Sequence, residues 1–100
     1  MKIVRLFLFL AMGYCVYILY SISVDRYYVG QTSNLEDRLK RHNQGRSKYT
    51  KSGIPWTLKY KESFASRSGA MAREKKIKSA KNREYLRRII HTSQNELNRS

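Results

Sequence analysis

Apolar and polar side chains along the chain predict three short β-strands. Residues 14–20 and 26–30 are rich in aromatic and β-branched side chains, which is typical of strands. In residues 56–61 apolar and polar side chains alternate, which indicates a half-buried strand. If a four-residue hairpin loop joins the first two strands, Tyr17 lies directly across from Tyr28 on one face of the sheet.

Three further segments have the periodicity of helices. The sequence Ser33-Asn-Leu-Glu36 has the form of a capping box, so we expect a helix from this point to about Asn43. Ser66 is a suitable N-cap for a second helix that ends at about Ser79, and a third helix begins at about Arg83. The expected inward-facing side chains are Ala70, Met71 and Ile77 in the second helix, and Tyr85, Leu86, Ile89 and Ile90 in the third.

The order of these elements is β-β-α-β-α-α, which predicts a single α/β (α+β) domain. Its three-stranded antiparallel or mixed sheet is flanked by helices, and a chain of 100 residues has room for little more. We place this domain at residues 12–90. Residues 91–100 are polar and are expected to form a frayed tail.

The N-terminus has an ambiguous composition. Lys2 and Arg5 precede the apolar residues 6–12, which resemble a short signal peptide, and the whole apolar segment covers residues 6–20. That segment is shorter than the ~20 residues a membrane-spanning helix needs, and its second half is predicted to be a strand. We therefore interpret residues 1–11 as an N-terminal extension, from an early start codon or for targeting, and Met12 as the start of the domain.

The charge of the chain points to a polyanionic partner. The net charge is +14, and 17 of the 21 basic residues lie between Arg38 and Arg88. Such a density suits nucleic acid, because each neutralised phosphate releases counterions. A basic solvated face, a membrane-surface protein and a ribosome-like structural protein are the alternatives. The single cysteine, Cys15, excludes a disulfide framework and a cysteine zinc site, and suits a cytoplasmic protein.

Two polar side chains of the first helix fall on or beside its apolar face. Leu35 and Leu39 define the inward face, His42 lies next to them, and Arg38 lies at the edge. Arg38 and His42 are four residues apart, so their side chains can converge on one point at the rim of the sheet. An ordinary amphipathic helix with a half-buried histidine explains the same pattern.

Glu74 projects from the apolar stripe of the second helix. Burial of an unpaired carboxylate costs several kcal/mol, so Glu74 should have a cationic partner. That partner is either a divalent metal or a basic side chain such as a neighbouring lysine. The pattern provides no second carboxylate, which argues against a two-metal site.

These groups together match the needs of phosphodiester hydrolysis. The attacking water must lose a proton, the negative charge on phosphorus must be stabilised, and the leaving oxygen needs an acid or a metal. A phenol such as Tyr17 or Tyr28 can bind water or phosphate, and can relay a proton if its pKa is lowered. Arg38 suits a phosphate geometrically, and a lone carboxylate suits a hydrated Mg²⁺ ion.

The same residues resemble the GIY-YIG nuclease superfamily. The tripeptide Val16-Tyr17-Ile18 resembles the first signature of that family, and Tyr28-Val29-Gly30 resembles the second, with valine at positions 16 and 29. Arg38 and His42 match its arginine–histidine pair, and Glu74 matches its metal-binding glutamate. The segments Lys48-Tyr-Thr50 and Ile54-Pro-Trp56 are similar to the small stand-alone bacterial members, which are themselves similar to the nuclease domain of the excision-repair incision subunit.

The resemblance implies a GIY-YIG fold and a role for each matching residue. Tyr17 would contact or deprotonate the nucleophilic water, and Tyr28 would help to hold that water and the phosphate. Arg38 would stabilise the phosphate charge with assistance from His42. Glu74 would bind one divalent cation, Mg²⁺ or Mn²⁺, that activates the leaving 3′-oxygen. The remaining matches are Gly30, for close approach of the backbone, and Asn82, as the nearest counterpart of a late asparagine.

The expected function is that of a metal-dependent DNA endonuclease, structure-directed and active in DNA repair or recombination. It would be a cytoplasmic, nucleoid-associated monomer or weak dimer without a small-molecule cofactor. A non-cleaving nucleic-acid-binding protein on the same fold is the alternative, and a membrane-associated basic protein is a third. The residues expected to hold DNA phosphates are Arg46, Lys48, Lys51, Lys75, Lys76 and Lys78.

Overall fold

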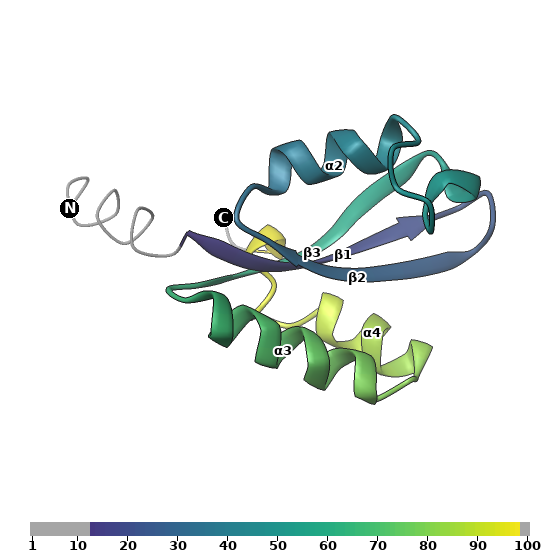
Figure 1. Ribbon diagram of the computed structural model, residues 1–100. Coiled ribbons are helices and arrows are strands. Elements are labelled where there is room, and N and C mark those ends of the chain that lie inside the picture. Colours follow the sequence, from purple (N-terminus) through teal and green to yellow (C-terminus); the bar gives the residue numbers. More distant parts are fainter. Residues whose placement is uncertain (1–12, 99–100) are drawn as a thin grey trace.

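The computed structural model describes residues 13–98, and its elements follow the predicted order (Figure 1). The expected extension, residues 1–11, and the last two residues of the tail lie outside the described residues. Within residues 13–98, none of the helices has the length and apolar character needed to cross a membrane. The elements are β1 (Tyr14–Ser21), β2 (Arg26–Thr32), α2 (Leu35–Asn43), the short 3-10 helix η1 (Lys51–Gly53), β3 (Trp56–Phe64), α3 (Arg67–Ser79), α4 (Arg83–Ile90) and the short 3-10 helix η2 (Glu96–Asn98).

The three strands form one antiparallel sheet in the order β2-β1-β3. The first strand of the chain is therefore the central one, and five consecutive residues of it, 15–19, are buried. A strand covered on both faces favours a continuous apolar run over alternation, which explains the composition of this segment. Cys15 belongs to this run as a buried free thiol. The predicted α+β architecture is confirmed.

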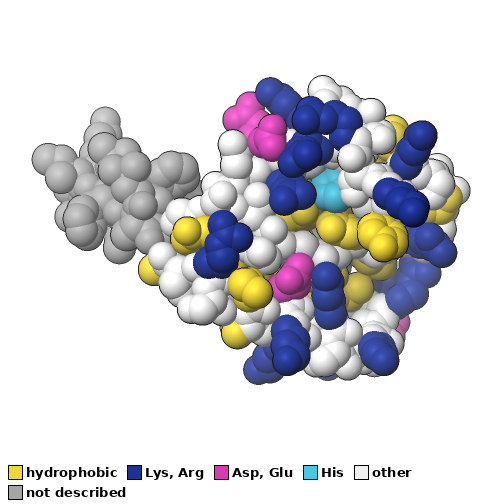
Figure 2. Space-filling model, viewed as in Figure 1, with side chains coloured by type: hydrophobic (Ala, Val, Ile, Leu, Met, Phe, Trp, Pro, Cys, Tyr) yellow, Lys and Arg dark blue, Asp and Glu magenta, His cyan; other side chains and the backbone are white. Residues whose placement is uncertain are grey.

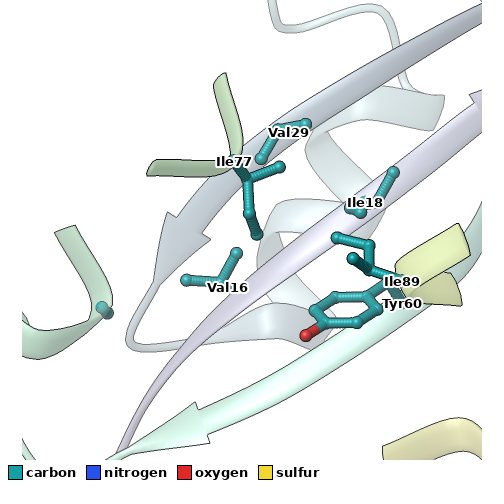
Figure 3. Packing of buried hydrophobic residues seen from close by; sticks show 7 residues of the cluster. Val16, Ile18, Val29, Tyr60, Ile77 and Ile89 are labelled. Carbon is teal, nitrogen blue, oxygen red and sulfur yellow. The ribbon is translucent and has the colours of Figure 1, made fainter. Parts of the chain in front are cut away.

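Helices cover both faces of the sheet, with α2 on one face and α3 and α4 on the other (Figure 1). Because side chains alternate along a strand, β1 contributes to two separate cores. Val16 and Ile18 pack toward α3 and α4 with Val29, Tyr60, Ala70, Ile77 and Ile89 (Figure 3). Tyr17 and Leu19 pack toward α2 with Trp56, Tyr28, Leu35, Leu39, Ile54 and Leu58. The second core carries the two candidate catalytic tyrosines, Tyr17 and Tyr28.

The register between β1 and β2 differs from the prediction. Tyr17 pairs with Gly30 and not with Tyr28, so the predicted pairing is wrong by two residues. The buried Ser21 stays in β1, where its Oγ accepts a hydrogen bond from the backbone N–H of Val24 (3.3 Å). This bond moves the hairpin loop one residue along the chain. A shift of two residues keeps Tyr28 on the same face as Tyr17, because side chains alternate with a period of two.

A β-bulge in β3 divides the apolar side chains of this strand between the two cores. The pairing with β1 shifts between Leu58 and Tyr60, which leaves Lys59 as an extra residue. Leu58 and Trp56 therefore pack under α2, whereas Tyr60 packs under α3 and α4. A regular strand, as predicted for residues 56–61, would place all three on one face.

Short polar side chains begin each helix, although one of them is not the predicted residue. The N-cap of α2 is Asn34, whose Oδ1 accepts a hydrogen bond from the backbone N–H of Asp37 (3.1 Å). The predicted cap, Ser33, is wrong because the helix begins one residue later, and asparagine and serine cap equally well. Ser66 caps α3 as predicted, and Asn82 caps α4.

The tail after α4 is packed against the sheet, so the prediction of a frayed tail is wrong for residues 91–98. Asn95 is 1% exposed. Its Oδ1 accepts from the backbone N–H of Lys61 (3.1 Å), and its Nδ2 donates to the carbonyls of Lys59 and Ile90 (2.8 Å each). The asparagine amide thus supplies hydrogen-bond partners to the backbone N–H of Lys61 and the carbonyl of Lys59 on the outer edge of β3. No other described strand pairs with this edge.

We expect Asn95→Ala to lower the free energy of unfolding by about 2–4 kcal/mol, because it empties a buried position and leaves part-buried backbone groups of β3 without partners. Asn98→Ala is the matched control: the exposed Asn98 amide also donates to two carbonyls, so its loss should cost no more than about 1 kcal/mol. Urea unfolding followed by circular dichroism measures both. Equal losses for the two variants would show that Asn95 does not fasten the tail.

Candidate active site

The candidate catalytic side chains reach the site from both faces of the sheet. Tyr17 and Tyr28 project from β1 and β2, and Arg38 and His42 come from α2. Glu74 comes from α3, which packs on β1 and β2 from the opposite face. Since β2 is an edge strand, groups on the two faces can approach one another around it.

A chain of hydrogen bonds runs from the sheet through α2 to the following loop. The hydroxyl of Tyr17 lies 3.1 Å from Nε2 of His42, and Nδ1 of His42 lies 2.8 Å from Oγ1 of Thr50. The hydroxyl of Thr50 donates to the carbonyl of Ser47 (3.5 Å). Thr50 Oγ1 therefore accepts from Nδ1–H, which leaves Nε2 of His42 to accept from Tyr17. All three side chains are at most 2% exposed.

Gly30 makes room for the ring of Tyr17. A Cβ atom at position 30 would lie 2.6 Å from the hydroxyl oxygen of Tyr17 and 2.7 Å from its Cζ. Both separations are far below a van der Waals contact, so any other residue at this position would displace the phenol. The sequence led us to expect a close approach at Gly30. The group that approaches it is the phenol of Tyr17, on the neighbouring strand β1.

Tyr28 completes an aromatic cluster around His42. Its ring centroid lies 4.8 Å from that of His42, 6.2 Å from that of Tyr17 and 6.5 Å from that of Trp56, with tilted or edge-on geometry. These distances are typical of favourable aromatic pairs. Tyr28 is half-buried, so it is more accessible to solvent than Tyr17. The structure therefore brings both tyrosines and the histidine together.

Trp56 holds the loop that carries Thr50. The indole Nε1–H donates to the carbonyl of Thr50 (2.6 Å). The Trp56 backbone forms two hydrogen bonds with the side-chain amide of Asn43, the last residue of α2. A Cβ at Gly53 would lie 2.4 Å from the indole ring, so the loop is also shaped around the tryptophan. The position of Thr50 relative to His42 is thereby fixed from both sides.

The pKa of Tyr17 is raised, mainly by burial and then by the neighbouring Tyr28, against the opposing effect of the Arg38 charge. The carboxylate of Glu74 also raises it, which places Glu74 within electrostatic range of the phenol. A raised pKa means that Tyr17 is a neutral phenol at neutral pH. The sequence analysis considered a lowered pKa for the tyrosines, and that prediction is wrong for Tyr17. This phenol therefore needs a base to receive its proton.

His42 is in a position to be that base. Burial lowers the pKa of His42, and the positive charges of Arg38 and Arg41 lower it further. The imidazole is therefore neutral at pH 7 and keeps a free lone pair on Nε2. Arg38 itself is exposed on α2, close enough to act electrostatically on both Tyr17 and His42.

The sequence left two partners open for Glu74, a divalent metal or a basic side chain. In the structure Glu74 has a basic partner. Its carboxylate lies 3.3 Å from Nζ of Lys78 on the same helix. The Lys78 side chain is 53% exposed and that of Glu74 is 22% exposed, and such i,i+4 pairs contribute only about 0.3–0.5 kcal/mol. A ligand cation can therefore displace this lysine. Met71, expected to face inward beside Glu74, is 50% exposed, so that prediction is wrong.

The donor set at Glu74 fits a hydrated hard cation. No cluster of three or more His, Cys, Asp or Glu side chains occurs among residues 13–98. A site that lacks such a cluster does not suit zinc, which takes three or four protein ligands. Mg²⁺ keeps several waters and is commonly held by one or two carboxylates and by substrate phosphates. Glu74 is the described residue that would hold such an ion.

The six cations expected to hold DNA are all exposed. Arg46 and Lys48 lie on the loop after α2, Lys51 begins η1, and Lys75, Lys76 and Lys78 lie on α3. Figure 2 shows that Lys and Arg side chains surround a hydrophobic area with a histidine at its border, and that acidic side chains are few on this face. Such a surface attracts an anion toward its centre.

Some residues of the site were not predicted to act there. Thr50 bonds to His42, whereas Trp56 and Asn43 hold the loop that carries Thr50. The sequence signal for Thr50 and Trp56 was their position in segments 48–50 and 54–56, which resemble the small stand-alone members of the family. Asn82, the nearest counterpart of the late asparagine, caps α4 by accepting from the backbone N–H of Glu84 (2.9 Å). This bond gives Asn82 a structural role.

Comparison with known proteins identifies small relatives of this chain. A UPF0213 protein of Staphylococcus haemolyticus is 44% identical over 63 residues, which cover 62% of this chain and 77% of that protein. A UPF0213 protein of Natronomonas pharaonis is 41% identical over 71 residues, covering 70% and 82%. One from Halobacterium salinarum is 47% identical over 53 residues, covering 52% and 69%. No solved structure matches the chain.

A sequence model of the GIY-YIG catalytic domain matches residues 13–87, about three quarters of the chain. The matched region contains both tyrosine tripeptides, the arginine–histidine pair of α2 and Glu74. The resemblance found in the sequence is thus confirmed, and the chain belongs to the GIY-YIG family of nuclease domains.

Proposed function

We propose that this protein is a metal-dependent endonuclease that hydrolyses DNA phosphodiester bonds. The observation that carries the proposal is the buried hydrogen-bond chain from Tyr17 through His42 to Thr50, with Arg38 and Glu74 within electrostatic range of Tyr17. This arrangement would supply a proton acceptor, a phosphate-binding cation and a metal-binding carboxylate to one phosphodiester. Membership of a nuclease family supports the same activity.

Tyr17 and His42 would together remove the proton from the attacking water. As the water oxygen bonds to phosphorus, its proton moves to the phenolic oxygen of Tyr17, and the phenolic proton moves to Nε2 of His42 across the 3.1 Å hydrogen bond. The phosphorus–O3′ bond breaks and the leaving 3′-oxygen takes a proton from solvent water, which leaves a 5′-phosphate and a 3′-hydroxyl. The positive charge gained by His42 is stabilised by its Nδ1–H bond to Thr50.

Arg38 would couple this proton transfer to substrate binding. In the free protein the charge of Arg38 lowers the pKa of His42, which makes His42 a weaker base. When the guanidinium of Arg38 pairs with a DNA phosphate, that charge is compensated and the anion favours protonated His42. The pKa of His42 therefore rises when the substrate is in place. Tyr28, at the more open end of the aromatic cluster, would hold the water and the phosphate.

Glu74 would hold the divalent cation, Mg²⁺ or Mn²⁺, after displacement of Lys78. When bound, such an ion stabilises negative charge on the phosphate and on the leaving 3′-oxygen. The basic loop after α2 and the basic face of α3 would hold the flanking phosphates without reading bases. This contact pattern favours recognition of DNA structure, as in repair or recombination, over recognition of a long sequence.

Glu74→Gln should reduce Mg²⁺-dependent nicking of plasmid DNA by on the order of 100-fold or more, because an amide is a far weaker ligand than a carboxylate. DNA binding in the presence of a chelator should be retained. The matched control is Glu84→Gln, which removes the same charge and a helix ion pair of the same length, 3.3 Å, with Arg87. Full nicking by Glu74→Gln would refute the metal assignment.

Tyr17→Phe should lower the cleavage rate by about 10²–10⁴-fold, because it removes the hydroxyl that connects the water to His42. Single-turnover cleavage at saturating DNA measures the chemical step and leaves binding aside. Tyr85→Phe, a half-buried tyrosine on α4, is the control and should cleave like the unaltered protein. If both phenylalanine variants retain the normal rate, proton transfer does not pass through Tyr17.

A further inference from the structure

A hollow of about 570 Å³ lies beside the candidate active site, at the edge of β2. Tyr49 of the loop before η1 lines it, together with residues of α3, of α4 and of the turn between them. Tyr28 of the candidate site also lines it, with the neighbouring residues of β2. The volume is within the range of small-molecule sites, roughly 300–1,000 Å³.

Tyr49 is the most exposed large aromatic side chain of the described chain, at 84%. The next residue, Thr50, is completely buried and bonded to His42, so the backbone that carries the Tyr49 ring is held in place. The ring contributes little to either hydrophobic core. A large ring presented to solvent on an anchored backbone is suited to contact a planar ligand.

The rim of the hollow is positively charged. Arg26, Lys78, Lys81 and Arg83 line it, whereas Asp25 is the acidic residue among the lining residues. Asp25 is paired with Arg83 at 2.6 Å, so it does not engage Arg26 or Lys81. Lys78 forms an ion pair with Glu74 at 3.3 Å, and its half-exposed side chain can exchange that partner for a phosphate.

The backbone of Lys81 supports a role for its side chain. Its φ angle is 47°, in the left-handed region that disfavours residues with a Cβ. Glycine would relieve this strain in the connection between α3 and α4, yet a lysine occupies the position. Backbone strain of this kind is commonly retained where a side chain serves a ligand.

An aromatic wall with a cationic rim matches the chemistry of an unpaired nucleotide. Bases stack on aromatic rings irrespective of sequence, and the phosphates on either side need cations. A base within a duplex is stacked on its neighbours and cannot enter such a hollow. The hollow also continues into the candidate active site, because Tyr28 belongs to both and Lys78 bonds to Glu74.

We propose that the hollow binds one unpaired nucleobase, stacked on Tyr49, with its flanking phosphates on Lys78 and Lys81. On this account the substrate class of the nuclease is DNA with an unpaired nucleotide next to the cleaved bond, such as a flap, a bubble or a single strand. The inference about substrate rests on the proposed function. The stacking site itself does not require cleavage.

The test is a binding experiment in metal-free buffer with the full chain. The probes are a single-stranded oligodeoxynucleotide that contains 2-aminopurine, whose fluorescence falls on stacking, and a duplex of the same sequence. Tyr49→Ala should lose the quenching and bind the single strand about ten-fold more weakly, with duplex binding changed less than about two-fold. Tyr49→Phe should keep both properties. Lys48→Ala, which removes a nearby exposed charge, should weaken both probes equally.

Two results would overturn the stacking site: unchanged quenching in Tyr49→Ala, or equal losses for single strand and duplex. Because Tyr49 is exposed, misfolding of the variant is not expected to obscure either result. Cleavage of flap and duplex substrates is then measured separately with Mg²⁺. Normal stacking without cleavage of any DNA would contradict the proposed function alone. A cleavage rate that is the same for flap and duplex DNA, and is unchanged in Tyr49→Ala, would contradict the inference alone.

Discussion

The hydrogen bond from the Tyr17 hydroxyl to Nε2 of His42 is the interaction on which the rest of the site depends. It joins the central strand to α2 between two side chains that are each only 2% exposed, so bulk solvent competes little with the bond. The bond requires that the ring of Tyr17 pass over a residue without a side chain, and Gly30 provides that space. It also requires one tautomer of His42, and Thr50 selects it.

The architecture explains how a domain of this size carries both a core and a reaction site. The central strand sends alternate side chains to two cores, one that stabilises the fold and one that holds the aromatic cluster. The bulge of β3 assigns Tyr60 to the first core and Trp56 to the second. Because β2 is an edge strand, a phosphate at its rim can meet Arg38 from one face and Glu74 from the other.

Local patterns were sufficient to predict the order of elements, since hydrophobic periodicity and N-cap residues act over a few positions. The register of Tyr17 was not predictable, because it depended on a hydrogen bond within the hairpin loop that keeps Ser21 in the strand. The packed tail was missed because Asn95 is polar, and the backbone groups that it satisfies belong to an edge strand distant in the sequence. Thr50 was likewise invisible to periodicity, since its partner His42 lies eight residues away across a loop.

The most direct test of this account is the tautomer of His42, read from nitrogen-15 shifts in a long-range proton–nitrogen correlation spectrum at pH 7. A His91→Gln variant assigns the signals. The account predicts a neutral ring protonated at Nδ1 with Nε2 bare, and a pKa below the ordinary value of about 6.5. Thr50→Val should weaken the preference for that tautomer. A ring protonated at Nε2, or a charged ring at pH 7, would contradict the account, since neither can accept the proton of Tyr17.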